Sequence, residues 1–154
     1  MTALTLESVE VGEARVEALV RVSAGAPLRT SDVSGLAATA LALMPGLARH
    51  RCECGSAHGI AGELADTPTP HLLEHVALEL MVLSGSPREL AGETAWDFAV
   101  DGPRTYRVVL DYDDDLVAVG ALEAGTRMVD GLLGLASIPD VTGEVVRLRA
   151  LRAR

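Results

Sequence analysis

Residues 69–87 read TPHLLEHVALELMVLSGSP, and this stretch predicts the helix around which the rest of the chain folds. Thr69 supplies a capping hydroxyl, and Pro70 in the first turn has no N–H to leave unpaired. Gly85 and Pro87 are typical of a helix end. A single helix is therefore expected between these two signals.

The predicted helix is apolar almost all the way round. Successive residues turn by about 100°, so its sides can be read from the spacing. Apolar residues cover both sides, with Leu72, Leu73, Val76, Ala77, Leu80 and Leu83 on a wide arc and Leu78 and Val82 opposite. Such a helix is buried, and an unpaired charge on it would cost several kcal/mol. His71, Glu74 and His75 share one side and must therefore be paired or bound to a metal ion.

The spacing of these three residues is typical of a zinc site. His71 and His75 lie one turn apart and can direct ring nitrogens at one ion, at the ~2.0 Å that zinc requires. Glu74 lies between them and can take a proton from metal-bound water. The order H-x-x-E-H is that of the inverzincin metallohydrolases, in which the histidines bind zinc and the glutamate is the general base. The alternative is that these groups satisfy one another as buried polar residues.

The third ligand must come from another segment. Inverzincins of the pitrilysin type take it from a glutamate on a later helix, which makes Glu123 the candidate here and Asp115 the second choice. Against this, Glu123 and Arg127 have the spacing of an ordinary i, i+4 surface pair. Glu79, one turn beyond His75, is too far along the axis to share the ion, so it is expected to orient the His75 ring or to face solvent.

A second cluster precedes the helix. Residues 50–58, HRCECGSAH, contain both cysteines and two of the four histidines: His50, Cys52, Cys54 and His58. Thiolate and imidazole are the ligands that zinc prefers, so a structural zinc site is one interpretation. A C-x-C pair chelates less readily than C-x-x-C, which favours a buried, reduced Cys52 with the histidines bonded to the loop or lining the cleft. A residue of the 50–63 segment also stays open as the third ligand of the main site.

The flanking segments predict an α+β fold. Residues 4–11 and 14–22 alternate apolar and polar side chains and indicate one hairpin. Residues 94–100 and 105–112, joined by the turn at 101–104, indicate a second. We therefore expect an antiparallel sheet built from two hairpins, with helices packed on one face and the H-x-x-E-H helix in the centre.

The remaining segments supply the other predicted helices. Thr30 or Ser31 is expected to cap a helix that ends near Met44, and the aspartates at 113–115 favour the start of another that ends near Leu133. The segment from 50 to 70 is expected to be a long loop, and the tail from 144 to 154 fits a helix or a strand equally well.

The composition limits the partners. The 154 residues have the length of a single domain, 1–154, and a formal charge of −9. This charge argues against a nucleic-acid partner, because phosphate binding needs a basic face, and it suits a peptide or polymer that carries positive charge. We find no leader and no apolar run of about eighteen residues, so no membrane partner is expected and the cytoplasm is the expected location. Association into a homo-oligomer stays open.

Several segments resemble the N-terminal domain of cyanophycin synthetase. They are LMPGLARHRC, HGIAGEL, HLLEHVALEL, the glycine two residues before Pro87, and TYRVVLDY, over roughly residues 41–133. The resemblance implies a domain that helps to hold an aspartate–arginine polymer, and in some members a zinc metallopeptidase that cuts it. It implies that His71 and His75 bind metal and Glu74 is the base, with His50, Cys52 and Glu63 at structural positions. The domain is expected to stand alone, without an ATP-grasp or ligase portion.

Two departures from the family pattern concern the substrate. Residues 87–96, PRELAGETAW, place Glu93 where a substrate-binding arginine is expected, and HGIAGEL lacks the aromatic residue of the family. The expected function is therefore a zinc-dependent metallopeptidase or amidohydrolase acting on a peptide or isopeptide-like bond. The alternative is a non-catalytic module that binds or tethers a peptide or polymer.

Overall fold

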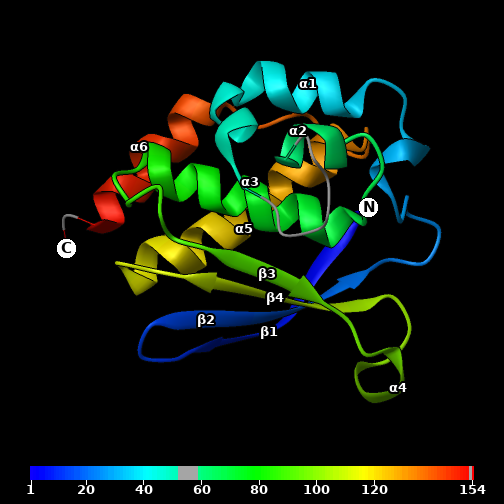
Figure 1. The fold of residues 1–154 in the computed structure, drawn as a ribbon, viewed down its shortest axis with the longest axis horizontal. Helices are drawn as coiled ribbons and strands as arrows, with labels where there is room; N and C mark the ends of the chain where they lie inside the picture. The colour runs from blue at the N-terminus through cyan, green and yellow to red at the C-terminus, as the bar shows by residue number, and fades with distance from the viewer. Residues whose placement is uncertain (52–58, 153) are drawn as a thin grey trace.

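The computed structural model describes residues 1–51, 59–152 and 154, and it confirms the α+β fold (Figure 1). A four-stranded antiparallel sheet carries the helices on one face. Its strands are β1 (Leu4–Val11), β2 (Arg15–Val22), β3 (Gly92–Ala95) and β4 (Thr105–Asp111), in the spatial order β1-β2-β4-β3. Two hairpins therefore lie side by side, joined through β2 and β4.

The first hairpin forms as the alternation predicts. β1 pairs with β2 from Leu4 opposite Val22 to Val11 opposite Val16. Along β2 every second residue from Val16 to Val22 is buried, whereas Arg15 and Arg21 are exposed. Because successive side chains of a strand point to opposite faces, the buried row lies under the helices and the charged row faces solvent.

The second hairpin is shorter than predicted. β3 ends at Ala95, and residues Phe98–Asp101 form a single helical turn, α4, so the expected strand over 94–100 is wrong beyond Ala95. The reason is local, since the Asp97 carboxylate accepts a hydrogen bond from the N–H of Val100 and caps the turn. The turn projects beyond the sheet in Figure 1.

Most of the remaining chain forms the helical layer. Its elements are η1 (Thr30–Asp32), α1 (Leu36–Leu43), η2 (Pro45–Arg49), α2 (Gly59–Glu63), α3 (Thr69–Leu83), α5 (Asp115–Leu132) and α6 (Val141–Arg152). Figure 1 shows α3 in the middle of this layer, between α1 and the sheet. Eleven of the twelve residues from Pro70 to Met81 are buried, and the twelfth, His71, is half-buried. The predicted central, buried helix is confirmed.

Three expected helix details differ from the prediction. The helix expected from Thr30 or Ser31 begins at Leu36, because the Thr30 hydroxyl accepts a hydrogen bond from the N–H of Thr67 and Ser31 donates to Asp66. The loop expected over 50–70 contains the short helix α2. Thr69 does not cap α3, since its hydroxyl is buried and has no hydrogen-bond partner among the described residues.

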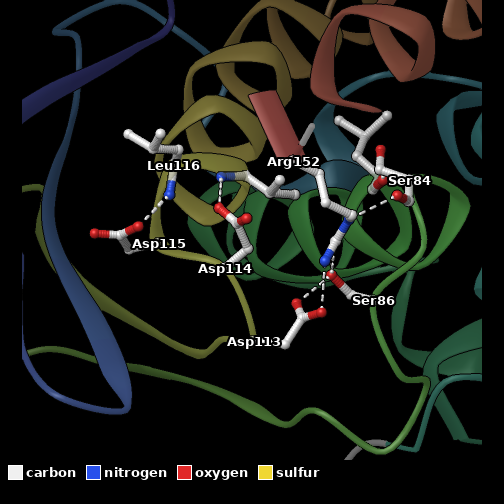
Figure 2. Close-up of polar contacts among 9 residues, drawn as sticks. Ser84, Ser86, Asp113, Asp114, Asp115, Leu116 and Arg152 are labelled. Carbon is white, nitrogen blue, oxygen red and sulfur yellow. Dashed lines mark hydrogen bonds and ion pairs between the residues drawn. The ribbon is translucent and has the colours of Figure 1, made fainter. Parts of the chain in front are cut away.

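The start of α5 confirms the role of the three aspartates. Asp114 is the capping residue and accepts a hydrogen bond from the N–H of Val117, while Asp115 accepts one from the N–H of Leu116 (Figure 2). Carboxylates are favoured here because the helix dipole is positive at this end. Among the described residues, no helix combines the length and the apolar character needed to cross a bilayer.

The C-terminal segment is a helix, α6, and an ion pair ties its end to the rest of the domain. The Arg152 guanidinium donates to Asp113 at 2.6 Å and to the Ser86 hydroxyl at 2.7 Å (Figure 2). It also donates to the carbonyl of Ser84 at 3.1 Å. Burial opposes ionisation of Asp113, but the hydrogen bonds from Ser86 and Arg152 outweigh it and hold the pKa of Asp113 below its ordinary value.

The Asp113→Asn variant is expected to lower the free energy of unfolding by about 1 kcal/mol at neutral pH, because it replaces a charge-assisted bond at a partly exposed site. A carboxyl whose pKa is depressed by folding stabilises the protein above its unfolded pKa of about 3.9, and this contribution disappears as the pH falls through the folded value. Urea unfolding of both proteins should therefore differ at neutral pH and converge in acid. A difference that stays constant over this range would contradict the assignment.

Candidate metal centre

Three side chains of α3 direct their polar atoms at one point. The Nε2 atoms of His71 and His75 lie 3.1 Å apart. The Glu74 Oε2 atom lies 2.9 Å from His75 Nε2 and 3.4 Å from His71 Nε2. Among the described residues, these three form the group whose ligand atoms all fall within 4.8 Å of one another. The convergence expected from the i, i+4 spacing is therefore present.

The separations suit a tetrahedral ion. Zinc binds imidazole nitrogen and carboxylate oxygen at about 2.0–2.2 Å, so two of its tetrahedral ligands are about 3.3 Å apart. The three observed distances, from 2.9 to 3.4 Å, lie around this value. The chemistry of the three donors therefore fits zinc.

Neighbouring segments fix the three side chains in place. The Nδ1 atom of His71 is hydrogen-bonded to the Thr67 hydroxyl at 2.7 Å, which orients the ring from its outer side. The backbone of β3 begins directly against Glu74, since a Cβ atom on Gly92 would lie 2.9 Å from the Glu74 Cγ atom. A larger residue at position 92 would displace the carboxylate.

Burial sets the electrostatics of the group. The side chains of Glu74 and His75 are only 3% and 5% exposed, and that of His71 is 14% exposed. Burial lowers the pKa of His71, the neighbouring His75 lowers it further, and the charges of Glu74 and Glu63 oppose this shift. A lowered pKa favours the neutral imidazole, which is the form that binds a metal ion.

A second layer of polar groups lies behind His75. The Nδ1 atoms of His75 and His50 are 3.0 Å apart, and the His50 Nε2 atom is 2.9 Å from Glu79 Oε1. Arg88 donates to the same Glu79 oxygen at 3.1 Å. Glu79 is buried, so a solvent-facing position is wrong, and it reaches the His75 ring through His50 instead of touching it. Burial opposes ionisation of Glu79, but the bonds from His50 and Arg88 outweigh it and lower its pKa.

Glu123 is not brought to this group. It is exposed on α5 and lies two residues before Gly125, which contacts Leu73 of α3. Two residues correspond to about 200° of helix rotation, so Glu123 faces away from α3 in this arrangement, and its role as third ligand stays a prediction. The alternative of an i, i+4 pair also differs, since Arg127 pairs with Glu144 of α6.

The other candidates are placed as follows. Asp115 is exposed and bonded within its own helical turn, away from the group. Glu63 of α2 is close enough for its charge to act on His71. Cys52, Cys54 and His58 lie outside the described residues, so the structural zinc site stays a prediction. His50 was expected to bond to the loop or to line the cleft, and its contact with His75 was not predicted.

A model of the cyanophycin synthase-like N-terminal domain matches residues 18–134 of the chain. The chain belongs to this family. The matched region of this cyanophycin synthase-like domain runs from β2 to the turn after α5 and contains every residue of the α3 group. It confirms the resemblance and extends it beyond the expected limits of 41–133. No curated protein matches the chain.

Proposed function

We propose that this domain is a zinc-dependent hydrolase that cleaves a peptide or isopeptide-like bond. In this proposal His71 and His75 bind the metal ion and Glu74 is the general base. Family membership supports a role related to cyanophycin, the aspartate–arginine polymer.

The observation that carries the proposal is the convergence of two ring nitrogens and one carboxylate oxygen within 3.4 Å in a buried position. The outer nitrogen of each ring is already engaged, His71 by Thr67 and His75 by His50. Three electron-pair donors held this closely repel one another unless a proton or a metal ion lies among them. When bound, zinc would polarise the scissile carbonyl and acidify a water molecule.

Glu74 is suited to move the proton. Its carboxylate lies beside both rings and against the backbone of Gly92, so its position is fixed before a substrate arrives. A general base must lie within hydrogen-bond reach of the proton it takes, and the same group can return that proton to the leaving amine. Glu63, whose charge acts on His71, is the next carboxylate that could complete the ligand set.

The substrate class follows from charge. The chain carries a formal charge of −9, which attracts an arginine-rich polymer and repels a polyanion. Glu93 of β3 lies near Glu17 and Arg107 on the face of the sheet opposite the α3 group, since its neighbour Gly92 is the residue that faces Glu74. A polymer that carries arginine residues is therefore the proposed substrate class.

A second candidate function is a module that binds the polymer without cutting it. The near-complete burial of Glu74 and His75 favours this candidate, because a catalytic base needs access to substrate and water. The two candidates differ in turnover and not in binding, so an assay of polymer cleavage separates them.

The first test measures zinc in protein purified without a histidine tag. The wild type is expected to hold about one zinc ion per chain, and His71→Ala and His75→Ala are expected to lose it, because each removes one of two imidazole ligands. Glu123→Gln is the control, since this exposed residue lies away from α3 and its zinc content should equal that of the wild type. Wild-type protein that stays metal-free in added zinc would show the proposal to be wrong.

A further inference from the structure

His75, His50, Glu79 and Arg88 form a chain of hydrogen bonds, and the chemistry of its members decides which atom donates at each step. Glu79 is buried and accepts a hydrogen bond from Arg88, which keeps its carboxylate ionised. An ionised carboxylate can only accept hydrogen bonds. The His50 Nε2 atom, 2.9 Å from this carboxylate, must therefore carry a proton and donate it.

The direction continues into the metal site. With a metal ion on its Nε2 atom, a neutral His75 ring carries its one proton on Nδ1, so the His50 Nδ1 atom must be bare to accept it. The His75 Nδ1 atom lies 3.0 Å from it and must be the donor. The remaining nitrogen of His75, Nε2, faces His71 and Glu74, where the metal ion would lie. The opposite direction would set a bare His50 nitrogen against the Glu79 carboxylate.

We propose that His50 and Glu79 are positioning residues that hold His75 in the tautomer whose Nε2 electron pair faces the metal ion. The arrangement extends the carboxylate–histidine–metal pattern by one imidazole, with Arg88 holding the carboxylate. The proposal rests on the proposed function for the identity of the ion. It assigns to His50 and Glu79 a role in metal affinity and not in the bond cleavage itself.

Element η2 builds the pocket for this network. His50 directly follows η2, and the backbone of η2 packs on Glu79 so closely that a Cβ atom on Gly46 would lie 2.0 Å from Glu79 Oε2. Gly46 does not have a positive φ, so the glycine is needed for space and not for backbone conformation. The side chains of His50 and Glu79 are 7% and 2% exposed, so water does not replace the bonds between them.

The test compares ring tautomers and zinc affinity in the full chain. Nitrogen-15 NMR of the metal-free wild type is expected to show His75 protonated on Nδ1 and His50 on Nε2. In competition with a chelator, His50→Leu is expected to bind Zn²⁺ 10–100-fold more weakly than the wild type, the usual effect of losing such a partner. His50→Asn, whose amide oxygen can stand near the place of Nδ1, should recover most of that affinity.

Gly46→Ala tests the same hydrogen bonds without changing His50 or Glu79. The added methyl group displaces the Glu79 carboxylate without touching a ligand, so it should weaken Zn²⁺ binding and shift the His75 proton toward Nε2. Thermal melting of each variant identifies loss of affinity that comes from unfolding.

Two results would overturn the inference. One is a His75 Nδ1 atom that carries no proton in the metal-free wild type. The other is unchanged Zn²⁺ affinity in folded His50→Leu. Wild-type protein that takes no Zn²⁺ would overturn the proposed function instead, and the tautomer of the metal-free protein would still decide the inference.

Discussion

Glu74→Gln is expected to keep about one zinc ion per chain and to lose 10²–10⁴-fold in turnover, the usual contribution of a general acid–base. Glutamine has nearly the same shape, so it fits beside Gly92 and the two rings, but it takes up no proton near neutral pH. The measurement is zinc content together with the rate of cleavage of short aspartate–arginine polymer chains.

The outcome also assigns the role of Glu74. Its Oε2 atom is as close to the two ring nitrogens as a third ligand would be. Loss of zinc in Glu74→Gln would make Glu74 a ligand and would contradict its role as the base. Retained zinc with unchanged turnover would exclude it from both roles. Glu63→Gln is the matched comparison, because Glu63 acts on His71 without belonging to the converging group.

Local patterns predicted most of the fold. β2 buries every second residue, α3 begins and ends near the Pro70 and Gly85 signals, and α5 begins at the predicted aspartates. Each of these signals acts over a few residues, so no knowledge of the tertiary structure is needed to interpret it. The α3 group was predictable for the same reason, since His71 and His75 meet through helix geometry alone.

The errors arose where distant segments compete for the same side chain. The hydroxyl of Thr30 was expected to cap a helix, but Thr67 occupies it from a segment 37 residues away. Glu123 was assigned to the site without knowledge of which side of α5 packs on α3. Gly125, which has no side chain, marks that side, and close packing of helices at small residues was the signal that could have placed Glu123 away from α3.

The packing of α5 against α3 leads to the second large effect. A Cβ atom on Gly125 would lie 2.7 Å from Leu73 Cδ1, and Leu73 is fully buried beside Glu74. Gly125→Leu is therefore expected to lower the free energy of unfolding by about 3 kcal/mol through overpacking. Leu73→Ala is expected to cost about 3 kcal/mol through the cavity that it leaves. Urea unfolding measures both, with Glu123→Leu on the exposed side of α5 as the control, expected within about 0.5 kcal/mol of the wild type.

The double variant separates this contact from general damage to the core. A leucine at position 125 points at the space that Leu73→Ala empties, so the two changes should compensate each other. The combined loss is expected to be smaller than the sum of the single losses by at least about 1 kcal/mol, because residues in contact are not additive. Additive losses would mean that Gly125 and Leu73 do not limit how closely the helices approach. Since Leu73 precedes Glu74, a shift of α3 at this contact would also move the carboxylate, and zinc content measured on the same variants would register it.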